Sequence, residues 1–412
     1  MAAEVPTLDA TVPALLVKLG RYPYHHGALA IVRSLGRAGI PTYAITEDPY
    51  TPVARSRYLT GRFVQRDPPD GSAVSLVTQL LDIGERIGRR SIPIPTDDGA
   101  AVALAERADE LRGHFLLPQV PRDLPRTLAT KQGMFGLCRT YGVPTPQTFC
   151  PGSIEEAVDQ ARQLTYPVIA KNAEPWTPRS AQKVKCTTVI RDEHDLLDRF
   201  ANTDDLHGLL LQEYIPHEHS EDWFVALHAS TTNLVQFVGH KARAWPPRSG
   251  VTADGRAAPN PYLSEITAAL VRQIGWQGTA DVEWRLDRRD GRYLLVDFNV
   301  RVGAQFRCGQ TEDGIDVVRA LHLDLTGRHL PSSPQDYTHR LVVGNLLLPT
   351  LIGERIARVP PPPRPPATSR TERAWLAADD PVPGLVMLTR GARSVAAAIS
   401  DNWRTWRLRR RK

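Results

Sequence analysis

Cysteine is scarce and unpaired in this chain. Its 412 residues include only Cys138, Cys150, Cys186 and Cys308, with no C-x-x-C spacing. Cysteines that are scattered in this way argue against a zinc site and against a disulfide framework. No run approaches the roughly 18 apolar residues that a membrane-spanning helix needs. The first residues are acidic and lack a basic region before an apolar one, so they predict no secretory signal and favour the cytoplasm.

A charge excess of one sign is also missing from most of the chain. The formal net charge is +6, but six cations and no acids fall within the last nine residues. The remainder is therefore neutral, and we predict no specific nucleic-acid partner. Residues 395–412 combine these cations with Trp403 and Trp406. This pattern is typical of a segment that contacts a membrane surface or an acidic partner, with a solubilising tail as the alternative.

A glycine-rich nucleotide fingerprint is absent near the N-terminus. Residues 12–46 predict a strand, a helix and a second strand, which is a βαβ unit of a parallel sheet. The loop after the first strand contains only Gly20 and Gly27, so it lacks the G-x-G-x-x-G pattern of nicotinamide-binding folds. His25 and His26 stand in this loop. A plain loop role is favoured for them over contact with a ligand.

The segment 279–301 carries the strongest pattern in the chain. Two runs that alternate apolar and polar residues, 280–286 and 293–300, flank a turn cluster at 287–291. This arrangement predicts an antiparallel hairpin with a five-residue connection.

The period of two in the second strand places Asp297, Asn299 and Arg301 on one face. A turn centred near Gly291 would set Glu283 directly opposite Asp297. Facing carboxylates repel one another unless a cation lies between them. Mg²⁺ prefers such oxygen ligands, so the sequence predicts a metal site at Glu283, Asp297 and Asn299. A solvated polar face of an ordinary hairpin is the alternative.

Two lysines stand at positions that suit an anionic ligand. Lys131 falls in the first turn of a helix expected over about 129–141, where a cation is unfavourable for the helix dipole. Lys171 closes a predicted strand. A later strand ends in Glu213, Tyr214 and Ile215.

These features, followed by the sequence Asp-Phe-Asn-Val-Arg at 297–301, occur in an order that resembles the ATP-grasp superfamily, in particular its carboxylate–amine ligases. The resemblance covers about residues 12–328. It implies an α/β fold with an N-terminal Rossmann-like parallel-sheet (pre-ATP-grasp) domain over 1–118. A two-lobed α+β ATP-grasp domain would follow over 119–328, its lobes dividing near 215. Residues 329–412 would form a C-terminal extension with a proline-rich linker and the basic tail.

The resemblance also implies the roles of individual residues. ATP is expected at Lys131, Lys171, Glu213, Tyr214, Ile215 and either Glu221 or Asp222; Mg²⁺, or Mn²⁺ as an alternative, at Glu283, Asp297 and Asn299; and the substrate at Lys241, Arg243 and Arg301. Lys171 and Arg301 are the predicted catalytic residues. Lysine offers a compact charge to phosphate, and a guanidinium grips a carboxylate or an acyl phosphate through two hydrogen bonds.

The implied activity is an ATP- and Mg²⁺-dependent ligation of a small-molecule carboxylate to an amine through an acyl phosphate. Amino acids and small specialised metabolites fit as substrates. The alternative is a non-catalytic ATP-binding regulatory or scaffold protein recruited by its basic tail. One departure from the family pattern concerns residues 172–186, which contain no glycine where a phosphate-covering loop is often glycine-rich. The sequence leaves open whether the protein is a homodimer.

Overall fold

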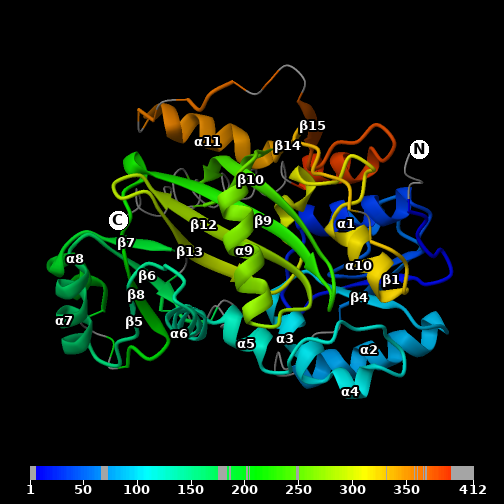
Figure 1. Cartoon of the computed structure of the whole chain (residues 1–412), viewed down its shortest axis with the longest axis horizontal. Coiled ribbons are helices and arrows are strands. Elements are labelled where there is room, and N and C mark those ends of the chain that lie inside the picture. Colours follow the sequence, from blue (N-terminus) through cyan, green and yellow to red (C-terminus); the bar gives the residue numbers. More distant parts are fainter. Residues whose placement is uncertain are drawn as a thin grey trace, which may run out of the picture.

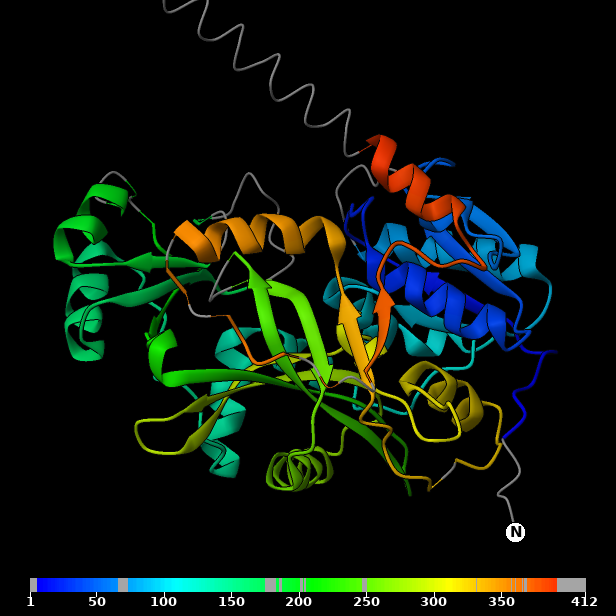
Figure 2. The ribbon, with the colours of Figure 1, turned by 90° about the horizontal axis from the view of Figure 1, so that it is seen from above.

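The computed structural model describes most of the chain, and helices pack around its sheets (Figures 1 and 2). The described residues are 6–65, 73–174, 183–184, 187–200, 203, 205–246, 250–330, 332–356, 358–359, 361–364, 366 and 369–390. Within them lie three β-sheets. No helix in this part of the chain is both long and apolar enough to cross a bilayer.

The first sheet has four parallel strands in the order β3-β2-β1-β4. Its elements are β1 (Ala14–Val17), α1 (His26–Arg37), β2 (Thr42–Thr46), η1 (Val53–Arg55), β3 (Gly61–Val64), α2 (Ala73–Ile87), β4 (Ile92–Pro95), α3 (Asp98–Glu106) and α4 (Ala108–Leu111). The predicted βαβ unit is confirmed as β1-α1-β2. Every residue of β1 is buried, as expected for a central parallel strand covered on both faces.

The second sheet is a small antiparallel one in the order β5-β8-β6-β7. This part of the chain contains α5 (Leu124–Ala129), α6 (Lys131–Tyr141), β5 (Thr148–Phe149), α7 (Ile154–Leu164), β6 (Val168–Asn172), β7 (Thr188–Ile190), α8 (Glu193–Phe200) and β8 (Leu209–Glu213). Thr130 caps the start of α6, and Gly142 ends it in a left-handed conformation with φ of +66°.

The third sheet has seven strands in the order β13-β12-β9-β10-β11-β14-β15. Its elements are η2 (His217–His219), β9 (Ser220–Ala229), β10 (Leu234–Trp245), β11 (Val251–Ala257), α9 (Pro261–Gln273), β12 (Gly278–Asp287), β13 (Arg292–Asn299), η3 (Ala304–Cys308), α10 (Val317–Leu325), β14 (His339–Val342), α11 (Gly344–Ile356) and β15 (Arg370–Arg373). Helix α9 covers one face of the sheet, whereas α11 lies on the side of the opposite face (Figure 2).

The segment predicted as a C-terminal extension is built into the body of the protein. Strand β14 pairs with β11, and β15 pairs in parallel with β14. Residues 382–390 form a further helix. Trp375 shares a core with Leu29 of α1 and Phe224 of β9. The N-terminal sheet and the last described residues therefore stabilise one another.

Candidate functional site

The hairpin of β12 and β13 has the predicted pairing at its polar end, whereas a register shift between Glu283 and Trp284 offsets the pairing nearer the turn by one residue. Glu283 is paired with Asp297, and Asp281 is paired with Asn299. Gly291 closes the turn with φ of +75°, a conformation that glycine adopts without strain. The connection is one residue shorter than predicted, because Asp287 still pairs with Arg292.

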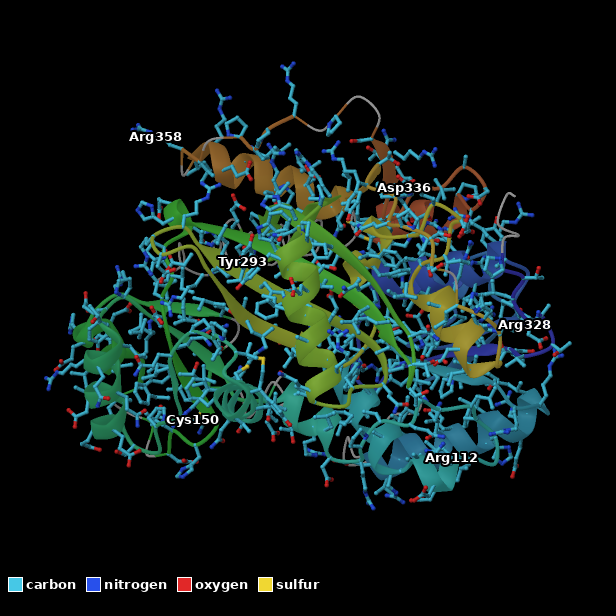
Figure 3. All side chains as sticks on the ribbon, viewed as in Figure 1. Arg112, Cys150, Tyr293, Arg328, Asp336 and Arg358 are labelled. Atoms are coloured by element: carbon cyan, nitrogen blue, oxygen red, sulfur yellow. The ribbon has the colours of Figure 1, made fainter. Side chains whose placement is uncertain are left out.

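The pairing sorts the hairpin side chains onto two faces. Val282, Trp284 and Phe298 enter the core beneath α9. Tyr293, labelled in Figure 3, lies beside the same helix, and its hydroxyl accepts a hydrogen bond from Asn260 Nδ2 at 2.7 Å. The opposite face carries a polar set made of Asp281, Glu283, Asp297 and Asn299.

Each facing carboxylate has a lysine from another element. The Lys131 ammonium, in the first turn of α6, pairs with Asp297. Lys241 Nζ, on β10, lies 3.2 Å from Glu283 Oε2. Burial opposes ionisation of Asp297, but Lys131, Lys171 and Arg301 together hold its pKa below the usual range. Charge compensation thus resolves the repulsion that the two carboxylates would otherwise create.

Lys171, at the end of β6, brings a further cation close to Lys131. Its Nζ donates to Gln212 Oε1 at 3.0 Å, and Gln212 Nε2 donates to Thr148 Oγ1 at 3.0 Å. Burial, and then the charge of Lys131, lower the pKa of Lys171 to about 8. Because the charges of Lys131 and Lys171 act on each other, the two lysines together favour binding of an anion such as phosphate.

Arg301 connects the hairpin to the N-terminal sheet. Its Nη2 donates to Asn299 Oδ1 at 3.0 Å, while Nε lies 3.9 Å from Asp98 Oδ1. Asp281 Oδ2 is 4.0 Å from Nη1. Burial disfavours the charge of Arg301, but Asp98 and Asp281 more than offset this effect and raise its pKa. The guanidinium is therefore a fixed positive charge between two parts of the fold.

Sequence reasoning missed Asp98 and Asp281. Asp98 begins α3 directly after β4, and the carboxyl ends of parallel strands are where α/β sheets bind ligands. Its Oδ1 is buried and has no hydrogen-bond partner among the described residues. Asp281 lies two residues before Glu283 on the same strand, so the alternation of the strand would have placed both side chains on one face.

Asp281 is held in place on both sides. Gln305 Nε2 donates to its Oδ2 at 3.1 Å. A Cβ on Gly303 would come within 1.9 Å of the same oxygen, so the close approach requires glycine. Burial, and then the charge of Glu283, raise the pKa of Asp281 well above its usual range.

The register separates the two candidates for a ribose contact. Asp222 is paired with Arg285, accepts from its Nε at 2.7 Å, and shares the sheet face of Glu283. Glu221 is paired with Leu286 on the other face, where it binds Arg288 and Trp223 Nε1.

The segment that closes β8 lies beside the start of β6, where Glu213 pairs with Val168. Glu213 Oε2 accepts from Gln147 N at 3.3 Å, Tyr214 is half-buried, and Ile215 is buried. The carboxylate of Glu213 is therefore already hydrogen-bonded to the backbone of Gln147.

The ion-pair partners of Arg243 lie outside the set of predicted site residues. Arg243 forms ion pairs with Asp254, at 3.5 Å, and with Glu354 of α11, at 3.0 Å. These pairs fasten α11 to the sheet. Of the two basic residues Lys241 and Arg243, Lys241 is the one whose side chain contacts Glu283.

The oxygen donors suit magnesium better than a transition metal. In the described part of the chain, no group of three or more His, Cys, Asp or Glu side chains could hold a metal ion. Two facing carboxylates and an amide oxygen nevertheless match Mg²⁺, which binds one or two protein carboxylates and completes its shell with water and substrate phosphates.

Comparison with known proteins gives distant relatives. No family model matches the chain. D-aspartate ligase of Enterococcus faecium is 24% identical over 249 residues, which cover 57% of this chain and 59% of that protein. The chain thus spans less than two thirds of the length of this relative.

Solved structures of similar fold cover more of the chain. N5-carboxyaminoimidazole synthetase from Staphylococcus aureus, complexed with ADP, has a TM-score of 0.60 at 13% identity and covers 81% of each chain. The biotin carboxylase domain of Hydrogenobacter thermophilus 2-oxoglutarate carboxylase, in complex with MgADP, has a TM-score of 0.55 at 18% identity. That match covers 78% of this chain and 71% of the other. This protein therefore has the fold of the ATP-grasp superfamily, and its sequence is related to carboxylate–amine ligases of that superfamily.

Proposed function

We propose that this protein is an ATP- and Mg²⁺-dependent ligase that joins a small-molecule carboxylate to an amine through an acyl phosphate. The observation that carries the proposal is the polar face of the β12–β13 hairpin. It faces four cations, namely Lys131 of α6, Lys171 of β6, Lys241 of β10, and Arg301 just beyond the end of β13. The related D-aspartate ligase, and the similar structures in complex with ADP or MgADP, support it.

ATP would bind against α6, β6 and β8, beside the polar face of the hairpin. Lys131 and Lys171 would bind its phosphates and give up their contacts with Asp297 and Gln212. The segment 212–215 would hold adenine through backbone groups, and Asp222 would accept from the ribose.

The proposal assigns Mg²⁺, or Mn²⁺, to Glu283, Asp297 and Asn299. The chemistry of these oxygen donors supports this assignment. A divalent ion bound there would neutralise part of the phosphate charge.

The chemistry needs positioning more than a protein nucleophile. A carboxylate oxygen of the substrate attacks the γ-phosphorus of ATP, the bond to the bridging oxygen breaks, and ADP leaves. The amine nitrogen then attacks the acyl carbon, loses a proton, and expels phosphate with the electron pair of the C–O bond. Arg301 would hold the carboxylate and then the acyl phosphate. Asp98, whose Oδ1 has no hydrogen-bond partner among the described residues and lies 3.9 Å from Arg301 Nε, would accept a hydrogen bond from the amine.

A non-catalytic ATP-binding scaffold is the other function that the sequence left open. All three proteins compared above are named as enzymes or parts of enzymes. They do not favour that alternative.

The first experiment is ADP release by the purified protein with ATP and Mg²⁺, across pools of amino acids and small carboxylates. We expect one pool to stimulate ADP release and to give a product lighter by one water than the two substrates together, as measured by mass spectrometry. ATP binding without stimulation by any pool would favour the scaffold. Failure to bind ATP would exclude both functions.

The shifted pKa of Lys171 predicts a pH dependence. Burial lowers this pKa to about 8. The side chain of Lys171 therefore carries a positive charge below pH 8 and loses that charge as the pH rises through this value. The kcat/KM for ATP should therefore fall above pH 8, approaching about tenfold per pH unit, because kcat/KM reports the free enzyme. In the Lys171→Arg variant the guanidinium stays protonated, so this fall should disappear even if overall activity is lower. An identical profile for both proteins would assign the titration to another group.

A further inference from the structure

Helix α11 presents an apolar stripe to solvent. Its inner side is fixed to the sheet, where Thr350 Oγ1 donates to Ala244 O at 3.3 Å and Glu354 pairs with Arg243. On its outer side, Leu348, Ile352 and Ile356 repeat at intervals of four residues and are 65%, 54% and 79% exposed. Such a stripe on a helix that is already packed is unusual for a surface in contact only with water.

A second apolar helix surface lies on the same side of the molecule. Figure 2 shows α11 and the helix of residues 382–390 along one edge, and Figure 1 places both toward the same edge. In the second helix Val382, Leu385 and Leu388 are exposed. We define the C-terminal apolar face as the exposed apolar residues of this edge: Leu348, Leu351, Ile352, Ile356, Leu376, Val382, Leu385 and Leu388.

An apolar cavity of about 480 Å³ opens between these two helices. Trp375, Met387 and Leu388 line it together with the β14 residue Val342. Arg373 also lines the cavity, and its side chain is exposed. The positively charged side chain of Arg373 therefore lies at the edge of this apolar cavity.

The charges around the C-terminal apolar face are positive. The four acidic residues between 344 and 390 are each bound by an arginine: Glu354 by Arg243, Glu372 by Arg307, Asp379 by Arg37, and Asp380 by Arg33. Arg355, Arg358, Arg364 and Arg373 are exposed. Arg358, labelled in Figure 3, points away from the body of the protein.

We propose that the C-terminal apolar face docks on an anionic phospholipid membrane surface. Aliphatic side chains beside exposed arginines match the two parts of such a surface, which are the acyl chain boundary and the negative headgroups. The inner side of α11 is already bonded to β10, so docking requires no unfolding.

A second copy of this chain fits the face less well. A twofold contact apposes the same surface of two subunits, so it would bring the same exposed arginines together. Like charges facing one another across a contact oppose association. The membrane is the occupant whose charge complements this face.

The test uses the full-length protein and vesicle sedimentation. We expect the protein to sediment with vesicles of equal parts phosphatidylglycerol and phosphatidylcholine, but not with phosphatidylcholine alone. The double variant Leu348→Ser/Ile352→Ser should bind the mixed vesicles about tenfold more weakly, because the inserted apolar surface is lost. Arg355→Gln and Arg358→Gln should each weaken binding by about fivefold, from roughly 1 kcal/mol per cation near such a surface.

The matched control is Val74→Ser, which removes an apolar side chain that is 57% exposed on α2. It should bind vesicles as the unchanged protein does. All changed residues are exposed, and circular dichroism checks that each variant is folded. The proposal is overturned if the unchanged protein ignores anionic vesicles, or if the variants of the C-terminal apolar face bind like the unchanged protein. It is also overturned if these variants abolish self-association measured by sedimentation equilibrium while vesicle binding is absent.

Discussion

Asp297→Asn is expected to lower ATP-dependent ADP release by about a hundred- to a thousandfold, the scale seen when one group that stabilises a transition state is removed. The substitution keeps the shape of the side chain but removes the negative charge opposite Glu283. That charge has two roles in the proposed function. It would hold the divalent ion, and it balances the ammonium of Lys131. Without it, the proposed site keeps its cations for phosphate but loses a metal ligand.

This loss should concern chemistry rather than folding or nucleotide binding. The Asp297 side chain is 34% exposed, and its strand is held by the ladder with β12. We therefore expect the fold to be kept, with a small fall in the midpoint of thermal unfolding because the Lys131 ammonium loses its partner. ATP affinity in the presence of a chelator should be equal or higher, because the lysines are less neutralised, while added Mg²⁺ should no longer tighten binding.

Asp290→Asn in the same hairpin is the matched control. Asp290 pairs with Arg292 at the exposed turn, far along the strand from the polar face. Its substitution should leave ADP release within about twofold, since surface pairs contribute little. Full activity of Asp297→Asn would remove the metal assignment, whereas equal losses in both variants would point to a general effect on the hairpin.

The hairpin was predictable because its signal is local. The alternation of apolar and polar residues and a turn cluster with Gly291 indicate the hairpin and its two faces. The pairing of Glu283 with Asp297 agrees with the prediction, but it also depends on a register shift between Glu283 and Trp284 that the sequence did not reveal. The placement of Lys131 in the first turn of α6 followed similarly, from a helix stopped at Gly142.

The remaining contacts could not be predicted because they join distant segments. Asp98 meets Arg301 across the junction of two sheets, and neither residue has a local pattern that reveals the other. Which of Glu221 and Asp222 shares the sheet face of Glu283 depends on the register of β9 against β12. Strands β14 and β15 have four residues each, and their pairing depends on partners far away in sequence. Propensity alone does not determine such pairings.

Arg33→Met is expected to destabilise the protein by about 3–5 kcal/mol, the cost of leaving one charge of a buried pair alone. Arg33 of α1 is 1% exposed and its Nε donates to Asp380 Oδ2 at 2.9 Å. The same guanidinium donates to the backbone oxygens of Ala374, Trp375 and Asp380 at 2.9–3.2 Å. One side chain thus fastens the last described segment to the N-terminal sheet.

The neighbouring pair on the same helix supplies the control for this prediction. Arg37 binds Asp379, but both side chains are partly exposed, so Arg37→Met should cost less than about 1 kcal/mol. Thermal unfolding and hydrogen exchange in residues 374–390 measure both effects. Exchange matters because a chain with several sheets need not unfold in one step.

A third variant separates the buried charge from the lost packing. In Arg33→Met/Asp380→Leu neither charge is buried, so part of the stability should return if the unpaired carboxylate causes the loss. Ser56 Oγ and the backbone N–H of Arg57 also donate to Asp380 and would then lose their acceptor, which limits the recovery. If Arg33→Met costs no more than Arg37→Met, these two donors alone satisfy Asp380. The attachment of the C-terminal segment would then rest on the apolar contacts of Trp375 with α1 rather than on the ion pair.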